Sequence, residues 1–307
     1  MNMESWRTVH ALQLERGVSS VVVASNGERY REQLDQVRQG SDEAVKASEA
    51  ASFYDALKAE REAVDQALRG APANVERSGE VFYSVFNAFS DLIKHTMGTA
   101  MARQRHSAVV KTFARLKEEL AKERGFVASV LALPELALGS LPARAFGDFV
   151  VCRHSQHAHV ACLRDLVHME GEELDLVNAG INPPPVLEVV RTRLLRTFDV
   201  AGVRACTSLD EWWELMNTFV DHMLAVQRRL IVLTLDGASG SSIGSDDMGD
   251  EKHAYDLVKS AASAIAAPIP PSTQQRPRPQ GGHEGTVRGP FPVVSSGPDE
   301  SGSGGEE

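Results

Sequence analysis

The sequence predicts an all-α protein, an elongated up-and-down bundle of helices that is followed by a disordered C-terminal tail. Apolar residues recur at helical spacing through most of the first 236 residues, and the alternation typical of a strand is nowhere sustained. Ala, Leu, Glu and Arg, which favour helix, are abundant, whereas aromatic residues make up only 6% of the 307 residues. The breaks between periodic segments contain Gly, Pro or Asn, which are typical of turns.

Five helices are expected in the first 133 residues. The first ends at Asn26-Gly27, a favourable pair for a helix C-terminus, and the second is broken by Gly40. Ser41 can then cap the third helix, and Pro134 follows the end of the fifth. The expected ranges are about residues 3–25, 28–39, 43–69, 78–98 and 103–133.

Four more helices are expected before the composition changes. A run of three prolines, beginning at Pro183, separates the second from the third, since proline lacks the amide donor that a helix interior needs. After Asp236, Gly, Ser, Pro and Asp predominate. We therefore expect a helical domain over residues 1–236 and a disordered, acidic tail over residues 237–307. The four helices are expected at about residues 143–167, 170–178, 186–199 and 209–235.

The charge balance argues against one class of function. A net charge of −10 at pH 7 without a basic stripe is unfavourable for nucleic-acid binding. Three cysteines, Cys152, Cys162 and Cys206, make no disulfide framework and favour a reducing compartment. No signal peptide or transmembrane segment is apparent, so a cytoplasmic location is expected for this chain, with membrane association only if it is part of a longer receptor.

One short motif, Leu-x-x-Glu-Arg-Gly, occurs twice, beginning at Leu12 and at Leu120. On a helical wheel its two arginines, Arg16 and Arg124, both fall on apolar stripes. A guanidinium on a core face is unfavourable unless it meets an anion. The repeated motif therefore points to a pocket that holds a small anion.

A third arginine, Arg191, lies on the apolar stripe of its own expected helix. Arginine suits planar oxyanions such as nitrate and nitrite, because its flat guanidinium combines five donors with a permanent charge. Ser19 and Ser20, one turn past the first motif arginine, can add hydroxyl donors. Gly17 and Gly125 destabilise their helices by about 1 kcal/mol each relative to Ala, which suggests that they leave room for close helix approach.

At this point the sequence resembles a known family. Residues 12–20 resemble the first-helix motif of the nitrate- and nitrite-sensing (NIT) domain, and residues 41–44 resemble its next stretch. Residues 122–125 are similar to its second arginine motif, and residues 209–213 to its tryptophan-containing last helix. The likeness spans about residues 6–236.

The resemblance implies two four-helix bundles that bind nitrate or nitrite and pass a signal to an attached output. It implicates Arg16 and Arg124 in ligand binding, whereas Arg191 is chosen from the helical wheel, with Arg193 and Arg153 as alternatives. The expected partners are nitrate or nitrite, a second copy of the chain and an output that is not recognisable in the sequence. No cofactor is expected.

Other kinds of site have weaker support. No P-loop, nucleophile elbow or dinucleotide-binding glycine motif is present, so we expect no enzyme. Five potential metal ligands fall close together, but on a helix they divide between faces. No face offers three ligands within one or two turns, whereas structural zinc needs four. We therefore expect no metal at these positions, which are Cys152, His154, His157, His159 and Cys162.

The main alternative is a helical protein-interaction scaffold that binds no ligand and whose arginines are paired internally. Trp212 and Trp213 offer a ligand platform, but their helical neighbours Met216 and Asn217 favour a packing role. Internal carboxylates bonded to Arg16 and Arg124 would support the scaffold.

Overall fold

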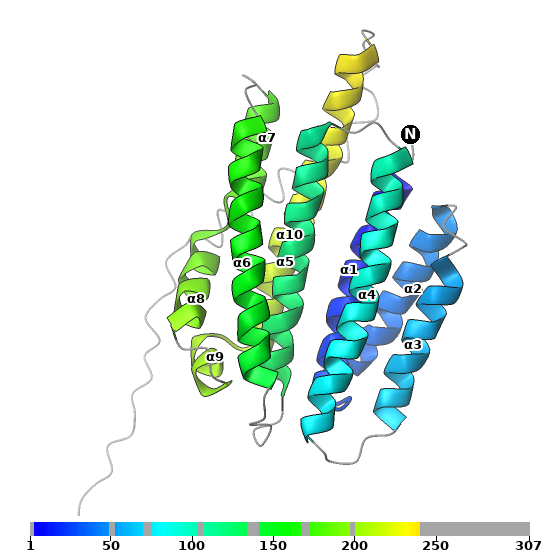
Figure 1. Ribbon diagram of the computed structural model, residues 1–307, viewed down its shortest axis with the longest axis vertical. Coiled ribbons are helices and arrows are strands. Elements are labelled where there is room, and N and C mark those ends of the chain that lie inside the picture. Colours follow the sequence, from blue (N-terminus) through cyan, green and yellow to red (C-terminus); the bar gives the residue numbers. More distant parts are fainter. Residues whose placement is uncertain are drawn as a thin grey trace, which may run out of the picture. The chain divides into compact units, whose positions relative to one another are not determined.

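Helices account for nearly all of the chain that the structure describes (Figure 1). A computed structural model describes residues 3–48, 53–69, 75–103, 107–133, 141–166, 172–196 and 200–239. These ranges contain ten α-helices and no β-strand, which confirms the all-α fold class. The helices are α1 (Glu4–Ala24), α2 (Arg31–Ala47), α3 (Tyr54–Arg69), α4 (Val75–Arg103), α5 (Ala108–Ala132), α6 (Leu141–Leu166), α7 (Glu172–Ile181), α8 (Pro185–Arg196), α9 (Val200–Cys206) and α10 (Leu209–Ser239).

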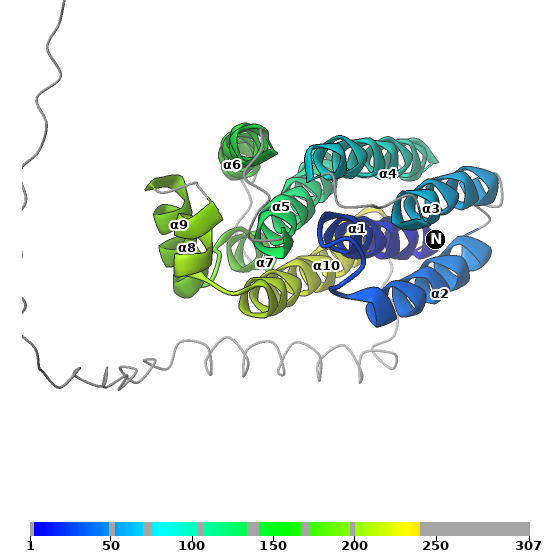
Figure 2. The same cartoon turned by 90° about the horizontal axis from the view of Figure 1, so that it is seen from below.

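Helices α1 to α6 run alternately up and down, and the described helices form two groups (Figures 1 and 2). In the first group α1 packs against α2 and α4, and α3 packs against α4. In the second group α5 packs against α6 and α10, and α10 packs against α7, with the short helices α8 and α9 at the edge. The groups meet because α1 and α5 pack directly against each other.

The helices α1 and α5 are the interior of this arrangement. In α1, 15 of 21 residues are buried, and in α5, 20 of 25, whereas α2 buries only three of its 17. A helix buried on all sides would ordinarily be apolar all round, yet both of these carry buried charged side chains. None of the described helices is both long enough and apolar enough to cross a bilayer.

The helix break expected at Gly40 is wrong. Helix α2 continues through Gly40 to Ala47, and Ser41 is a buried residue within the helix rather than a cap. A glycine in a helix interior is unfavourable by only about 1 kcal/mol, and the packing of Leu34 and Val45 on the same helix outweighs it.

Other boundaries also differ from the expected ones. Helix α4 passes through Gly98 to Arg103, and α9 is an additional helix, whose seven residues are too few for a periodic pattern. Helix α10 continues to Ser239, three residues past the expected domain boundary. The remainder of the predicted tail, residues 240–307, lies outside the described residues.

Two helix-interior glycines offer a matched pair of stability measurements. A Cβ at position 125 would lie 2.8 Å from Cε2 of Phe86, whose ring is stacked on Phe126 with centroids 4.3 Å apart and cannot easily yield. Gly125→Ala should therefore lower the free energy of unfolding by about 1–3 kcal/mol. A Cβ at Gly40 meets nothing within 4 Å, so Gly40→Ala should raise it by about 0.5–1 kcal/mol.

Urea unfolding of both variants beside the unsubstituted chain measures these changes. A neutral effect of Gly125→Ala would show that the α4–α5 contact is looser than described.

Candidate functional site

Polar side chains, all of them buried except the partly exposed Glu188, lie on two sides of α5. On the side of α1 and α10 they form what we call the α1–α5 cluster. On the side of α6 and α8 they form the α5–α8 cluster. The α1–α5 cluster consists of Gln13, Arg16, Lys117, Glu118 and Arg124, and the α5–α8 cluster of Glu123, Arg153, Gln156, Glu188 and Arg191.

Arg16 is fully buried and already has a carboxylate partner. Its Nη1 donates to Oε1 of Glu118 at 2.6 Å and to Oγ of Ser90 at 3.0 Å. Its Nη2 reaches the other carboxylate oxygen of Glu118 at 3.4 Å, so the pair is bidentate. Among the described residues, Nε of Arg16 has no hydrogen-bond partner.

Gln13 is bonded to three of the other four members of the α1–α5 cluster, and the fourth, Arg16, is bonded to Glu118. Its side-chain Nε2 donates to Glu118 at 2.7 Å, and its Oε1 accepts from Nζ of Lys117 at 3.0 Å. Its main-chain carbonyl accepts from Nη2 of Arg124 at 2.8 Å. Gln13 therefore holds two cations and one carboxylate in a single buried network.

Arg124 is buried without a carboxylate partner. Its Nη1 donates to Oδ1 of Asn217 on α10 at 2.7 Å, and its Nη2 donates to the Gln13 carbonyl. No carboxylate of the described residues is within ion-pair distance, and Nε has no partner among them. Burial lowers the pKa of Arg124 to about 10, and the positive charge of Arg16 contributes in the same direction.

The first motif glycine makes room for the ring that covers Arg124. The guanidinium carbon of Arg124 lies 5.0 Å from the ring centroid of Trp213, within cation–π range. A Cβ at Gly17 would lie 2.8 Å from Cη2 of Trp213 and 3.5 Å from Nε of Arg124. Any larger residue at position 17 would therefore displace Trp213. Tyr30 also contacts this ring, in an edge-on arrangement with centroids 5.4 Å apart.

The second motif glycine has the reciprocal role. A Cβ at Gly125 would collide with Phe86, and Phe86 is the ring beneath Arg16, with the guanidinium carbon 4.9 Å from its centroid. Each motif glycine thus admits the aromatic residue that covers the arginine of the other copy. The Leu-x-x-Glu-Arg-Gly repeat is a set of mutual contacts between α1 and α5 rather than two separate local structures.

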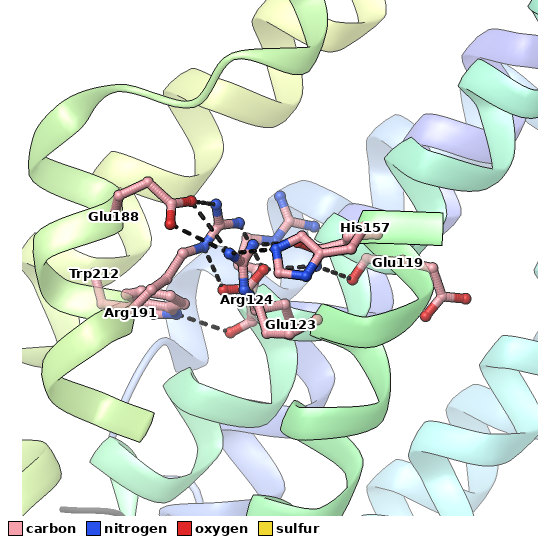
Figure 3. A network of polar contacts seen from close by, with 9 residues as sticks. Glu119, Glu123, Arg124, His157, Glu188, Arg191 and Trp212 are labelled. Carbon is pink, nitrogen blue, oxygen red and sulfur yellow. Dashed lines mark hydrogen bonds and ion pairs between the residues drawn. The ribbon is translucent and has the colours of Figure 1, made fainter. Parts of the chain in front are cut away.

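The motif glutamates also have matching roles. Glu15 accepts two hydrogen bonds from Arg61 of α3, at 2.7 and 3.0 Å. Glu123 accepts two from Arg191 of α8, at 2.7 and 2.6 Å (Figure 3). Both glutamates are fully buried, and each arginine therefore ties an outer helix to an inner one.

The structure does not bring Arg191 together with Arg16 and Arg124. Arg191 lies in the α5–α8 cluster. In addition to its ion pair with Glu123, it forms one with Glu188, in which the nitrogen and oxygen atoms are 2.7 Å apart. Of the two alternatives for the third arginine, Arg153 pairs with Glu188 in the same cluster at 3.2 Å, and the side chain of Arg193 is exposed. Two carboxylates already face Arg191, so its charge is balanced.

The two predicted supporting serines differ. The hydroxyl of Ser20 donates to the main-chain carbonyl of Arg16 at 2.7 Å, so its single donor is in use. The hydroxyl of Ser19 is buried and has no partner among the described residues. Of the two, Ser19 is the one with a donor to offer.

The α1–α5 cluster carries an excess of positive charge. Its one carboxylate, Glu118, is matched by Arg16, which leaves Arg124 and, when it is protonated, Lys117. His10 adds no charge near neutral pH, because burial lowers its pKa to about 4. Its Nε2 lies 3.2 Å from Oδ1 of Asp221, a carboxylate whose side chain is 63% exposed. Each remaining cation therefore has a neutral acceptor instead of a carboxylate among the described residues, an unfavourable arrangement for a buried charge.

The other residues singled out in the sequence have structural surroundings. Trp212 is fully buried, and its indole donates to the main-chain carbonyl of Arg124 at 3.1 Å (Figure 3). Cys152 is buried whereas Cys162 is exposed, so these two thiols do not face one site. Within the described ranges, no three His, Cys, Asp or Glu side chains are grouped so that they could hold a metal ion.

Sequence reasoning missed several members of the site. Lys117 lies seven residues before Arg124, two helical turns away on the same face, and Gln13 lies three residues before Arg16, so the wheel could have included both. The contact of Asn217 with Arg124 joins residues 93 apart in the chain and had no local signal.

Comparison with known proteins gives one match. A family model described as nitrate and nitrite sensing matches residues 7–232, which include both motif copies and both clusters. No curated protein and no solved structure matches the chain.

The two kinds of buried arginine should differ in their effect on stability. Arg191→Met leaves the buried carboxylate of Glu123 without its cation, and we expect the free energy of unfolding to fall by about 3–5 kcal/mol. Arg124→Met strands no carboxylate and removes a desolvated charge, so the loss should stay below about 2 kcal/mol. Urea unfolding at pH 7 without nitrate measures both, and equal losses would contradict the distinction.

Proposed function

Because the chain belongs to the nitrate and nitrite sensing family, we propose that its α1–α5 cluster holds the anion and that α10 carries the signal to an output. The family is a sensory one, and the proposal assigns the sensing step to particular side chains. Arg124 and Arg16 are the proposed ligand-binding residues, with Ser19 as a further donor.

The observation that carries this proposal is the unpaired charge of Arg124. Its guanidinium is buried against Trp213, and among the described residues it is bonded only to neutral oxygens and its Nε–H has no acceptor. Buried donors without partners are uncommon in folded proteins, and each calls for an explanation. Nitrate and nitrite offer only acceptors and a single negative charge, which match one guanidinium edge in both shape and charge.

Helix α10 is placed to respond to the ligand. Its residues Trp213 and Asn217 both contact Arg124, and its first turn is tied to the α1–α2 connection through Asp210, which accepts from Tyr30 and Arg29. An anion between Arg16 and Arg124 would relieve their mutual repulsion and draw the helices together. The signal requires that the ligand bind the two arrangements with different affinity.

The interaction scaffold without a ligand is the second candidate, and specific contacts favour it. Arg16 and Arg191 are already paired with Glu118 and Glu123. We place Arg191 outside the proposed site for this reason, since its role matches that of Arg61 at the other motif copy. Arg124 is the residue that separates the two candidates, because no carboxylate in the described part of the chain is paired with it.

Thermal unfolding with added anions tests the proposal. Sodium nitrate at a hundred times its Kd should stabilise the native state by about 2.7 kcal/mol, which corresponds to an increase in Tm of about 5–10 °C. Sodium nitrite should act in the same way, and sodium chloride at equal ionic strength should not. Arg124→Met should abolish the nitrate effect.

A control variant removes an arginine elsewhere. Arg38→Met deletes the same charge from α2, where Arg38 is bonded to Asp65, and should leave the nitrate effect intact. If nitrate gives no increase beyond that of chloride, or if Arg124→Met and Arg38→Met behave alike, the scaffold is the better description.

A further inference from the structure

Lys117 is a buried lysine that the proposal above does not use. It lies in the middle of α5 and is 1% exposed. Its one hydrogen bond among the described residues joins Nζ to the neutral amide oxygen of Gln13 at 3.0 Å. A buried ammonium ordinarily has a carboxylate and several acceptors around it, because burial of an unpaired charge is strongly unfavourable.

The charged groups around Lys117 do not supply that carboxylate. On its own helix it faces Glu118 and Arg124, from α1 it faces His10, and from α10 it faces Asp221 and Arg228. The single buried carboxylate among them, Glu118, is already bonded to Arg16 and Gln13. Asp221 is bonded to His10 and is largely exposed to solvent.

The protonation of Lys117 is therefore finely balanced. Burial lowers its pKa to about 7, and Arg124 and Arg228 act in the same direction, against the raising effect of Glu118 and Asp221. Near neutral pH a large share of the molecules has an uncharged amine at this position. A negative charge brought beside the amine would favour the protonated form.

We propose that Lys117 is a third cation of the anion site and that it takes up one proton from solvent when the anion binds. This inference rests on the proposed function, because it concerns the same site. The free amine, a proton and the anion combine to give an ammonium–anion ion pair, in which Nζ donates to an anion oxygen. No covalent bond of the anion changes.

The consequence is that the domain senses nitrate and acidity together. Above the pKa of Lys117, each unit of pH should weaken the apparent affinity about tenfold, since the protonated form becomes that much rarer. Well below that pKa the affinity should be constant. The sign follows from linkage: a ligand that binds the protonated form is favoured as the pH falls.

Isothermal titration calorimetry on the full chain with sodium nitrate tests this inference. The binding enthalpy is measured at pH 8 in several buffers that differ in ionisation enthalpy. The slope of the observed enthalpy against the ionisation enthalpy gives the number of protons taken up per nitrate bound. The unsubstituted chain should take up close to one proton per nitrate, and its affinity should fall at least tenfold between pH 6 and pH 8.5. Lys117→Met, which removes a buried charge while keeping an unbranched side chain, should take up none.

Affinity measurements complete the comparison. Lys117→Met should bind nitrate at least tenfold more weakly than the unsubstituted chain at pH 6 and equally at pH 9. Lys122→Met, on the same helix but paired with Glu119, should keep the proton uptake. His10→Gln is a second control, because His10 is also a titratable base near the site. This variant should keep the proton uptake as well.

The outcomes separate the inference from the function on which it rests. Nitrate binding without proton uptake, or uptake that survives in Lys117→Met or is lost in His10→Gln, overturns the role of Lys117 and leaves the anion site in place. Absence of nitrate-specific binding from pH 6 to pH 9 overturns the proposed function together with the inference.

Discussion

A guanidinium that enters a helical core keeps its charge, and the surrounding helices must be arranged to supply acceptors for it. Three fully or almost fully buried arginines, Arg16, Arg124 and Arg191, set this requirement along α5. For two of them the acceptors are carboxylates from a neighbouring helix. For Arg124 they are an amide oxygen, a main-chain carbonyl and the face of an indole, none of which cancels its charge. The difference between these two kinds of acceptor separates the arginines that hold the fold from the one that we propose to bind the ligand.

The packing around α1 and α5 follows from the same requirement. Aromatic rings lie over both motif arginines, and the glycine next to each arginine allows α10 to approach α1 and α4 to approach α5. The motif glutamates then bind Arg61 and Arg191, which attach α3 and α8 to the interior helices. The six-residue repeat therefore specifies much of the arrangement of both groups of helices.

Local patterns were sufficient to predict the helical class, the position of α1 and the burial of all three arginines. They failed at Gly40, where packing of α2 outweighs a modest local preference, and at α9, which is too short to show periodicity. The partners of the arginines could not be predicted, because the contacts of Arg16 with Glu118 and of Arg124 with Asn217 join residues about a hundred apart in the chain. A helical wheel shows that a side chain faces the core but not which helix it meets there. For that reason Arg191, which looked equivalent to the motif arginines, proved to lie in a different cluster.

The reciprocal contacts of the two glycines have a consequence for how this chain can diverge. Since the glycine of one motif determines the environment of the arginine in the other, a substitution in either copy changes which residues the other copy tolerates. The two hexapeptides thus constrain each other although Arg16 and Arg124 are 108 positions apart in the chain. Their similarity need not be the trace of an ancestral duplication, because mutual packing alone would keep the same six-residue pattern in both helices.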